Sequence, residues 1–309
     1  MKTVLITGAS SGIGAGLAKS FADDGYRVIA CGRDAQRLAA VHQHSPNITV
    51  RQFDMTDRDA CRQALADCAA DTVILCAGTC EYLDRGEVDA GRVARVMTTN
   101  FIGPVNCLAA LQPQLVSGNR VVLVSSMAHW LHFPRAEAYG ASKAALTWFA
   151  DTLRLDWAPK GIAVTVVSPG FVDTPLTRKN DFPMPGRVSV GDAVHAIRRG
   201  LAKGKDHIAF PAGFSLALRL LSGLPDVLQR ALRVVHRKAH LRFLPADAQF
   251  AEQPHEARIG AVVVDDKTGV DGKGALRRVD IHRCGMAARR GLRFKQRNLV
   301  MSGETPGTG

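Results

Sequence analysis

The chain has 309 residues, 46% of them hydrophobic, and a formal net charge of +12. This apolar content is enough to bury a sizeable core, so we expect one main domain with an appendage. Residues 190–309 hold 21 Lys and Arg against 11 Asp and Glu, so they carry +10 and residues 1–189 carry only +2. Because this basic part holds few aromatic or groove-reading elements, we expect no specific nucleic-acid partner.

The N-terminus, the apolar stretches and the cysteines indicate a cytoplasmic protein without a metal. Residues 1–8 hold one positive charge and a short apolar run without a cleavage-type site, which predicts a buried strand rather than a signal peptide. No uncharged apolar stretch reaches the roughly 18 residues of a membrane span, because Arg219 interrupts residues 214–224. The seven cysteines are scattered, which predicts reduced thiols, and the pair Cys76 and Cys80 lacks further ligands for a metal.

Short β-branched runs alternate with longer helical stretches from the N-terminus to about residue 170. We expect strands at residues 4–6, 27–30, 48–51, 72–75, 120–124 and 162–167, with a seventh at 207–210. We expect helices at residues 15–24, 36–41, 58–69, 86–115 and 136–157. This alternation predicts an α/β fold, a Rossmann-type doubly wound parallel sheet of about seven strands with helices on both faces.

The pattern changes after the sixth expected strand. Residues 171–190 contain three prolines and Gly186, which predicts a mobile substrate loop at the carboxyl end of that strand. The chain turns helical again over residues 216–244, and beyond that only residues 259–264 resemble a strand. We therefore divide the chain into a catalytic domain over residues 1–211, a basic amphipathic helical extension over 212–245, and a weakly ordered basic tail over 246–309.

A glycine-rich turn, TGASSGIG at residues 7–14, joins the first expected strand to the first helix. Gly8 permits a sharp exit from the strand, Gly12 lets the backbone approach a pyrophosphate, and Gly14 allows the helix to pack closely on the sheet. The amide groups at the helix N-terminus then face the phosphates. The turn predicts a dinucleotide site, and the alternative is that the glycines serve only to turn the chain.

The residue after the second strand favours one dinucleotide over the other. Dinucleotide folds often place an acid there to hold the ribose 2′-hydroxyl, but this chain has Gly32 followed by Arg33. A guanidinium suits a 2′-phosphate, which a carboxylate would repel. We expect NADP(H) as the cofactor, with NAD less favoured, and the alternative is that Arg33 is a solvated loop residue.

Tyr139 and Lys143 lie four residues apart on an expected helix, thirteen residues after Ser126. A lysine ammonium on the same helical face should bring the pKa of a tyrosine, near 10 when unperturbed, toward neutral pH. Tyr139 could then exchange a proton with a carbonyl oxygen that Ser126 also reaches. Each of the two residues alone could equally be an ordinary polar residue on a helix face.

Taken together, these motifs resemble those of the short-chain dehydrogenase/reductase family over about residues 1–211. The matching positions, in chain order, are Thr7, Gly8, Gly12, Gly14, Asp54, Cys76, Ala77, Gly78, Asn100, Ser125, Ser126, Tyr139, Lys143, Pro169 and Gly170. Cys76 departs from the family pattern, which generally has asparagine there to tie the central sheet together. By the family's spacing, the second serine of the pair, Ser126, is the catalytic one.

The resemblance implies a role for each matching residue. It makes Asn100, Ser126, Tyr139 and Lys143 catalytic, with Asn100 holding a water and Lys143 also binding the nicotinamide ribose. Asp54 would approach the adenine, and Thr174 would contact the carboxamide. The residues assigned to the cofactor are Gly8, Ser10, Ser11, Gly12, Ile13, Gly14, Arg33, Asp54, Ala77, Gly78, Tyr139, Lys143, Pro169, Gly170 and Thr174.

The expected function is an NADP(H)-dependent oxidoreductase that interconverts a carbonyl and an alcohol. Residues 128–134 together with Phe171, Leu176, Phe182 and Met184 predict an apolar substrate pocket. His129 and His132 could orient a polar group of the substrate, or they could be ordinary packed or solvated side chains. The alternatives are a catalytically silent NADP-binding regulatory or scaffold protein, and a non-redox isomerase or dehydratase on the same fold.

Two kinds of macromolecular contact follow from the pattern and from the resemblance. Residues 224–239 form a basic amphipathic segment, which could rest peripherally on an anionic membrane or pack on the protein itself or a partner subunit. The resemblance implies a homodimer or homotetramer built through the helices at residues 86–115 and 136–157.

Overall fold

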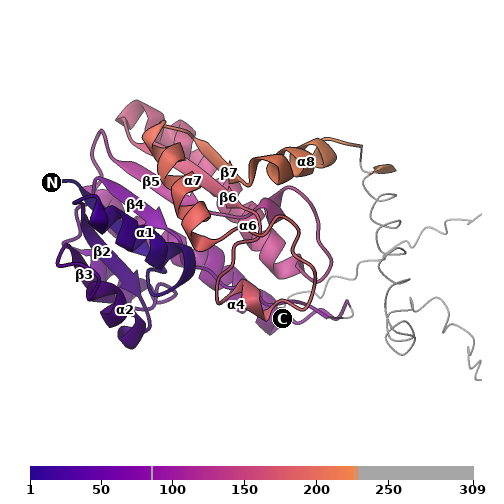
Figure 1. The fold of residues 1–309 in the computed structure, drawn as a ribbon, viewed down its shortest axis with the longest axis horizontal. Helices are drawn as coiled ribbons and strands as arrows, with labels where there is room; N and C mark the ends of the chain where they lie inside the picture. Colours follow the sequence, from indigo (N-terminus) through magenta and orange to yellow (C-terminus); the bar gives the residue numbers. More distant parts are fainter. Residues whose placement is uncertain (85, 226, 229–309) are drawn as a thin grey trace, which may run out of the picture. The chain divides into compact units, whose positions relative to one another are not determined.

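The computed structural model describes residues 1–84, 86–225 and 227–228, and within them the sheet has seven parallel strands (Figure 1). The strands are β1 (Thr3–Thr7), β2 (Arg27–Gly32), β3 (Ile48–Gln52), β4 (Thr72–Leu75), β5 (Arg120–Val124), β6 (Ala163–Pro169) and β7 (His207–Phe210). Their order across the sheet is β3-β2-β1-β4-β5-β6-β7. The predicted doubly wound sheet is confirmed.

The described helices are α1 (Gly12–Asp23), α2 (Ala35–His42), α3 (Arg58–Leu65), α4 (Ala90–Met97), α5 (Gly103–Leu111), α6 (Glu137–Trp157), α7 (Val190–Ala202) and α8 (Ala212–Ser222). On one face of the sheet, α1, α2 and α7 pack on a core that includes Val4 and Ile6 of β1. On the other face, α3, α5 and α6 pack on a core that includes Leu5. Successive β1 side chains therefore enter opposite cores, which is why a strand covered on both faces is apolar throughout.

The sheet reverses its order between β1 and β4, which lie side by side. Strand β1 pairs with β2 on one side and with β4 on the other, so the chain crosses back over the sheet after β3. At such a reversal the loops after the two strands diverge and leave a crevice at the carboxyl edge. The glycine turn follows β1 and the segment Cys76–Gly78 follows β4, so both motifs come to this edge.

The single helix predicted at residues 86–115 is wrong. Asp89 caps a helix that begins only at Ala90, since its carboxylate accepts from the amide of Arg92 at 2.9 Å. A π-helical turn over Thr98–Ile102 then separates α4 from α5. Pro104 explains the separation, because it has no amide hydrogen to donate to the carbonyl of Asn100 four residues earlier.

A helix was predicted at residues 216–244. The described helix in this region begins four residues before the predicted start and ends at Ser222. Helix α8 runs over Ala212–Ser222, and Gly223 and Pro225 follow it. Helix α7 was not predicted from the sequence at all. The other differences are shifts of element ends, of which the largest is α3, predicted to reach residue 69 but ending at Leu65. Most of the basic segment 224–239, the strand-like run 259–264 and the tail 246–309 lie outside the described residues, and the proposed domain limits stay predictions.

Candidate active site

The glycine turn is shaped by backbone atoms that leave no room for side chains. Gly8 and Gly12 have positive φ angles of 68° and 53°, which residues with a Cβ rarely adopt. A Cβ on Gly8 would lie 2.7 Å from the Cα of Ala77, and one on Gly14 would lie 2.3 Å from the carbonyl oxygen of Gly8. A Cβ on Gly12 would lie 3.1 Å from the methyl carbon of Thr174. The turn thus brings Ala77 and Thr174, both assigned to the cofactor, beside the glycines.

The N-terminus of α1, like those of α5, α6 and α8, has no side-chain cap. Ser11 is the N-cap residue, but its hydroxyl makes no capping hydrogen bond. In contrast, α2, α3 and α4 begin with Asp34, Asp57 and Asp89, whose carboxylates accept from backbone amides of the first turn. The first amides of α1 are therefore left to an outside acceptor, and a dinucleotide pyrophosphate fits this donor set.

Arg33 lies just beyond β2 and points toward Asp54, which follows β3. The guanidinium donates to the Asp54 carboxylate at 3.2 Å, and both side chains are substantially exposed. Burial alone would raise the pKa of Asp54, but hydrogen bonds from Thr56 and Arg33 outweigh it and hold the pKa below its usual value. A Cβ on Gly32 would lie 3.4 Å from the hydroxyl of Ser10, so this pair lies next to the glycine turn.

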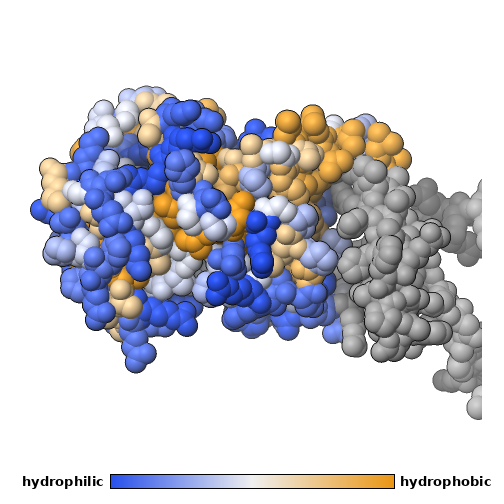
Figure 2. Space-filling model, in the orientation of Figure 1, coloured by the Kyte–Doolittle hydropathy of each residue, from blue (hydrophilic) through white to orange (hydrophobic). Residues whose placement is uncertain are grey.

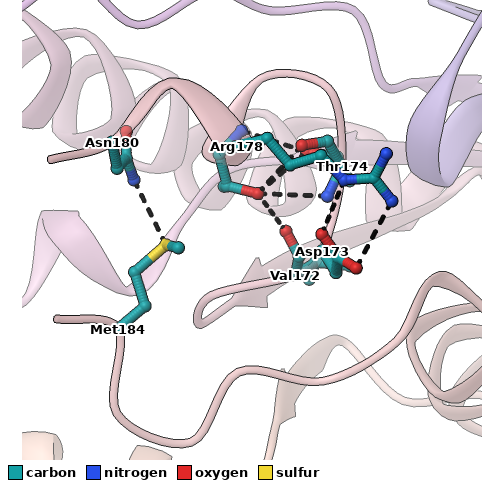
Figure 3. A network of polar contacts seen from close by, with 7 residues as sticks. Val172, Asp173, Thr174, Arg178, Asn180 and Met184 are labelled. Carbon is teal, nitrogen blue, oxygen red and sulfur yellow. Dashed lines mark hydrogen bonds and ion pairs between the residues drawn. The ribbon is translucent and has the colours of Figure 1, made fainter. Parts of the chain in front are cut away.

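The first part of the substrate loop is tied into a compact unit, as Figure 3 shows for Val172, Asp173, Thr174 and Arg178. The guanidinium of Arg178 pairs with the carboxylate of Asp173 at 2.9 Å. The hydroxyl of Thr177 accepts from the amide of Thr174 at 3.1 Å and donates to the carbonyl of Val172. These contacts fix the buried Thr174 against the glycine turn.

Lys143 projects from α6, and its ammonium lies between the end of β5 and the loop after β4. Its ammonium donates to the carbonyl of Val124 at 2.9 Å and lies 5.9 Å from the centre of the Tyr139 ring. A Cβ on Gly78 would lie 3.4 Å from this nitrogen and 3.2 Å from the side-chain oxygen of Asn100. Three of the predicted site residues therefore lie close together, namely Gly78, Asn100 and Lys143.

The two titratable groups of the pair have pKa values shifted mainly by burial. Burial lowers the pKa of Lys143 to about 8. Burial also raises the pKa of Tyr139 to about 12, although a hydrogen bond with Ser126 lowers it in part. The expectation that Lys143 brings the tyrosine pKa toward neutral pH is wrong for this geometry, because removing the phenol from water outweighs any effect of the ammonium.

The two adjacent serine side chains make different contacts. The hydroxyl of Ser125 donates to the carbonyl of Lys143 at 3.0 Å and lies 2.8 Å from the hydroxyl of Thr147, so it anchors α6 to β5. Ser126 instead accepts from the amide of Ala128 at 3.2 Å and keeps its hydroxyl hydrogen available to Tyr139. Of the two hydroxyls, that of Ser126 faces the tyrosine.

Asn100 is fully buried, and its side-chain amide is engaged by protein groups. Its oxygen accepts from the amide of Thr79 at 2.7 Å, and its nitrogen donates to the carbonyl of Thr79 and to the hydroxyl of Ser142, each at 2.9 Å. Asn100 therefore joins the π-helical turn to the loop after β4 and to α6. This contact explains why the helix is widened at this residue.

Tyr82 and Arg135 lie at the site but carry no sequence motif that would have revealed them. The hydroxyl of Tyr82 donates to the side-chain oxygen of Asn180 at 2.9 Å, and its ring packs edge-on against Phe182. Arg135 pairs with Asp84 and with Asp181, both at 2.8 Å, and its guanidinium lies 5.2 Å from the centre of the Tyr82 ring. Together they hold the substrate loop against the loop after β4.

The predicted substrate pocket is divided in the structure. Most of residues 128–134 line a cavity of about 610 Å³ whose other wall is α6, at Glu137, Gly140, Ala141 and Ala144. Phe171 and Phe182 pack elsewhere, against each other at 6.1 Å between ring centres. His129 also lines the cavity, but its Nδ1 donates to the carbonyl of Ser126 at 2.5 Å and burial lowers its pKa. It is a packed, neutral side chain.

In the part of the chain that the structure describes, no three side chains of His, Cys, Asp or Glu gather as a metal site would require. Among the same residues, no helix combines the length and the apolar character needed to cross a bilayer. The six described cysteines are free thiols.

Comparison with known proteins gives consistent matches. The family model described as short chain dehydrogenase matches residues 2–183. An uncharacterized oxidoreductase of Myxococcus xanthus (strain DK1622) is 35% identical over 238 residues, covering 74% of this chain and 94% of that protein. The 11-beta-hydroxysteroid dehydrogenase A of Sesamum indicum is 29% identical over 263 residues, and the match covers 76% of this chain and 75% of that protein.

A solved structure resembles the fold over most of the chain. It is a short chain dehydrogenase from Burkholderia cenocepacia J2315 in complex with NADP, with a TM-score of 0.64 and 25% identity. The likeness covers 79% of this chain and 98% of that one. The residues that the family model matches include the glycine turn and Tyr139.

Proposed function

Because the chain belongs to the short chain dehydrogenase family, we propose that it is an NADP(H)-dependent oxidoreductase that interconverts a carbonyl and an alcohol, with Tyr139 as the general acid and base. The observation that carries the proposal is the meeting of Ser126, Tyr139 and Lys143 beside the glycine turn. A protein that only bound a dinucleotide would have no use for the serine and the tyrosine.

The residues of the pair favour reduction of a carbonyl at neutral pH. With a pKa of about 12, the Tyr139 phenol is protonated and can donate its proton to a carbonyl oxygen. The Ser126 hydroxyl, which lies beside that phenol, can instead donate its hydrogen to the carbonyl oxygen and stabilise the charge that develops there. A nicotinamide dinucleotide bound at the glycine turn supplies the hydride.

Lys143 can act on the cofactor as well as on the phenol of Tyr139. Its ammonium is held by the carbonyl of Val124 at the edge of Gly78, where it can bind a cofactor hydroxyl. With a pKa of about 8, it is charged at neutral pH and neutral in alkali. Its charge then favours the phenolate that remains after the proton has left Tyr139.

Preference for NADP(H) is supported by the charge at the end of β2. Arg33 is exposed beside the turn, where its guanidinium can pair with a 2′-phosphate in place of Asp54. The remaining residues assigned to the cofactor, Ser10, Ile13, Pro169 and Gly170 among them, lie at the same edge of the sheet. The similar Burkholderia cenocepacia protein was solved in complex with NADP.

A lipophilic substrate is supported by the aromatic packing around the substrate loop. The rings of Tyr82, Phe182 and Phe171 line up in edge-on contacts of 5.6 and 6.1 Å between centres. One relative is named an 11-beta-hydroxysteroid dehydrogenase, and a steroid is a hydrophobic molecule. We propose a bulky hydrophobic ketone, aldehyde or alcohol.

A homo-oligomer through α6 is supported by the two large apolar side chains that this helix exposes. Trp148 is 79% exposed and Leu155 is 74% exposed. Light scattering coupled to gel filtration should give a mass that is a multiple of that of the chain, and Trp148→Glu should reduce it. A monomeric wild-type protein would contradict this assembly.

The function is tested by following NADPH and NADH oxidation over a panel of aldehydes, ketones and quinones. We expect turnover of hydrophobic carbonyls, with NADPH preferred by roughly ten-fold or more on the charge argument. Tight NADPH binding without oxidation by any member of the panel would instead favour a catalytically silent binder. Conversion of a substrate without net oxidation of NADPH would favour an isomerase or dehydratase.

A further inference from the structure

Helix α8 is apolar on the side that faces solvent as well as on the side that packs. Ser215 and Leu218 are buried against the domain, with exposed fractions of 9% and 6%. On the opposite side Leu216 is 60% exposed and Leu220 is 66% exposed. Figure 2 shows the hydrophobic colour gathered over this helix. A helix that is apolar all round is normally buried all round, so its outer face requires a cover.

Helix α7, which precedes α8 in the chain, has an apolar side that packs and a polar side that faces solvent. Its buried residues, Ala193, Val194, Ile197 and Gly200, form one stripe. Its opposite side carries His195 and Arg199, as expected for a solvated helix. In α8 the only charged side chain is Arg219, and its guanidinium lies over the ring of Trp130, 4.7 Å from the ring centre.

The apolar surface continues beyond the end of α8. Leu221 is 37% exposed, and after the proline that follows the helix Val227 and Leu228 are 77% and 50% exposed. We call Leu216, Leu220, Leu221, Val227 and Leu228 the leucine face. It consists of aliphatic side chains alone, whereas protein partners are usually recognised through Trp, Tyr and Arg.

The sequence around the leucine face is strongly basic. From residue 211 to residue 246 the only acidic residue is Asp226, while the basic ones are Arg219, Arg230, Arg233, Arg237, Lys238 and Arg242. Aliphatic side chains next to a run of basic residues suit a surface that is apolar inside and anionic outside. An anionic lipid bilayer has this character.

A second copy of the chain fits the leucine face less well. Helix α8 has 11 residues. A helix of that length is about 16 Å long and about 10 Å wide, so one side of it falls far short of the roughly 800 Å² per partner of a stable interface. A bilayer sets no such minimum area.

We propose that the leucine face docks on the surface of an anionic lipid bilayer. The aliphatic side chains enter the boundary between headgroups and acyl chains, and the basic composition of the adjoining sequence favours anionic headgroups. The contact is peripheral and reversible, because it adds electrostatic attraction to the burial of only a few side chains.

The docked face is connected to the active site by a series of aromatic rings. Phe214, on α8 itself, packs against Phe171 of the substrate loop at 6.3 Å between ring centres. Phe171 contacts Phe182, which contacts Tyr82. A lipophilic carbonyl dissolved in the bilayer would meet this apolar series first, and this extension of the inference rests on the proposed function.

Co-sedimentation of the full chain with lipid vesicles tests the docking independently of turnover. We expect wild type to sediment with mixed phosphatidylcholine and phosphatidylglycerol vesicles, and weakly with phosphatidylcholine alone or at high salt. Leu216→Glu combined with Leu220→Glu should reduce the bound fraction roughly ten-fold. The control is Val116→Glu, an apolar residue that is 60% exposed on another loop, which should bind as wild type does.

Three results would overturn the docking proposal. The first is wild type that stays in the supernatant with anionic vesicles, and the second is a double variant that sediments as wild type does. The third is a self-association, seen by sedimentation velocity without lipid, that the same double variant abolishes, because a second copy would then cover the face. Circular dichroism confirms folding of the variants, and the uncharged pair Leu216→Gln and Leu220→Gln replaces the first pair if it unfolds.

Kinetics test the link to the active site. The double variant should lose activity on a long-chain ketone supplied in vesicles by several-fold, yet keep its activity on a short water-soluble aldehyde. Equal loss on both substrates would contradict the proposed path. Absence of any turnover by wild type would count against the proposed function alone, since vesicle binding is measured without it.

Discussion

Around the glycine turn, positions are set by backbone atoms in contact with backbone atoms, whereas around the substrate loop they are set by side chains that pair across the surface. A Cβ on Gly14 would lie 2.3 Å from a carbonyl oxygen of the same turn. At the substrate loop, Arg135 holds two loops together through Asp84 and Asp181, and all three side chains are at least a third exposed. The first region has one possible geometry, while the second can rearrange at small cost.

This difference suits the two tasks of the site. A cofactor of constant shape can be held by a rigid backbone turn, and binding then needs no reorganisation. A loop that selects substrates must open and close, and exposed ion pairs and ring contacts permit that motion. The comparison predicts large effects for small changes at the turn and small effects for large changes at the loop.

The largest effect is expected from Gly14→Ala. The added Cβ would meet the backbone of Gly8, which cannot move without disrupting the turn, so the free energy of unfolding should fall by about 3 kcal/mol. NADPH binding, followed by fluorescence, should be lost. The matched control is Gly213→Ala, since a Cβ there meets nothing within 4 Å and alanine favours a helix. Equal stability of the two variants would refute the rigid description of the turn.

Arg33→Ala should act on one cofactor and not on the other. Loss of the guanidinium should weaken NADPH binding by about 10- to 100-fold, the usual value of one charge-assisted contact. NADH binding should change little, because its ribose carries no 2′-phosphate. Titration calorimetry with both cofactors measures the ratio. Unchanged NADPH affinity would make Arg33 a solvated loop residue.

Lys143→Met should change how stability depends on pH. The buried lysine has a folded pKa of about 8, below its unfolded value of 10.5, so below pH 8 it is charged in both states and its buried charge destabilises the folded state. Between these two values the unfolded chain binds the extra proton, and wild type gains about 1.4 kcal/mol per pH unit as pH rises. The variant lacks this gain, so its stability relative to wild type is greatest below pH 8. The free energies of unfolding of both proteins are measured with urea between the two pKa values. A difference between wild type and variant that stays constant with pH would contradict the shifted pKa of Lys143.

The smallest effect is expected from Arg135→Ala in the substrate loop. Breaking two exposed ion pairs should lower the free energy of unfolding by less than about 1 kcal/mol. Because the loop is then held less firmly, KM for the substrate should rise several-fold while NADPH affinity stays unchanged. Arg135→Lys keeps the charge but loses the two-pronged geometry, so its KM should lie between those of wild type and Arg135→Ala. A large loss of NADPH binding would mean that the two regions are not independent.

The same difference explains what could be predicted from the sequence. The glycine turn and the placing of Tyr139 and Lys143 on one helix were predictable, because they follow from backbone geometry and from one helical turn of spacing. The choice of Ser126 rested on the family resemblance. Tyr82, Arg135 and Phe214 were not, since they meet through contacts between segments far apart in the chain. The tyrosine pKa was mispredicted for a related reason. The distance to Lys143 follows from the helix, but burial depends on everything packed around it.

The break between α4 and α5 was also missed, although its cause is visible in the sequence. Pro104 removes one helical hydrogen bond, but the buried contacts of Asn100 with Thr79 and Ser142 decide that the helix widens rather than ends. Helical periodicity alone cannot distinguish these outcomes. Extended strands with continuous apolar runs were located well, since burial on both faces leaves a simple signal.

The central claim is that Tyr139 transfers the proton, and Tyr139→Phe tests it most directly. The variant should bind NADPH as wild type does, while steady-state turnover of the preferred carbonyl falls by about 10²- to 10⁴-fold. The matched control is Tyr82→Phe, which removes a neighbouring phenol hydroxyl and should keep most of the turnover. Turnover by Tyr139→Phe within ten-fold of wild type would contradict the account.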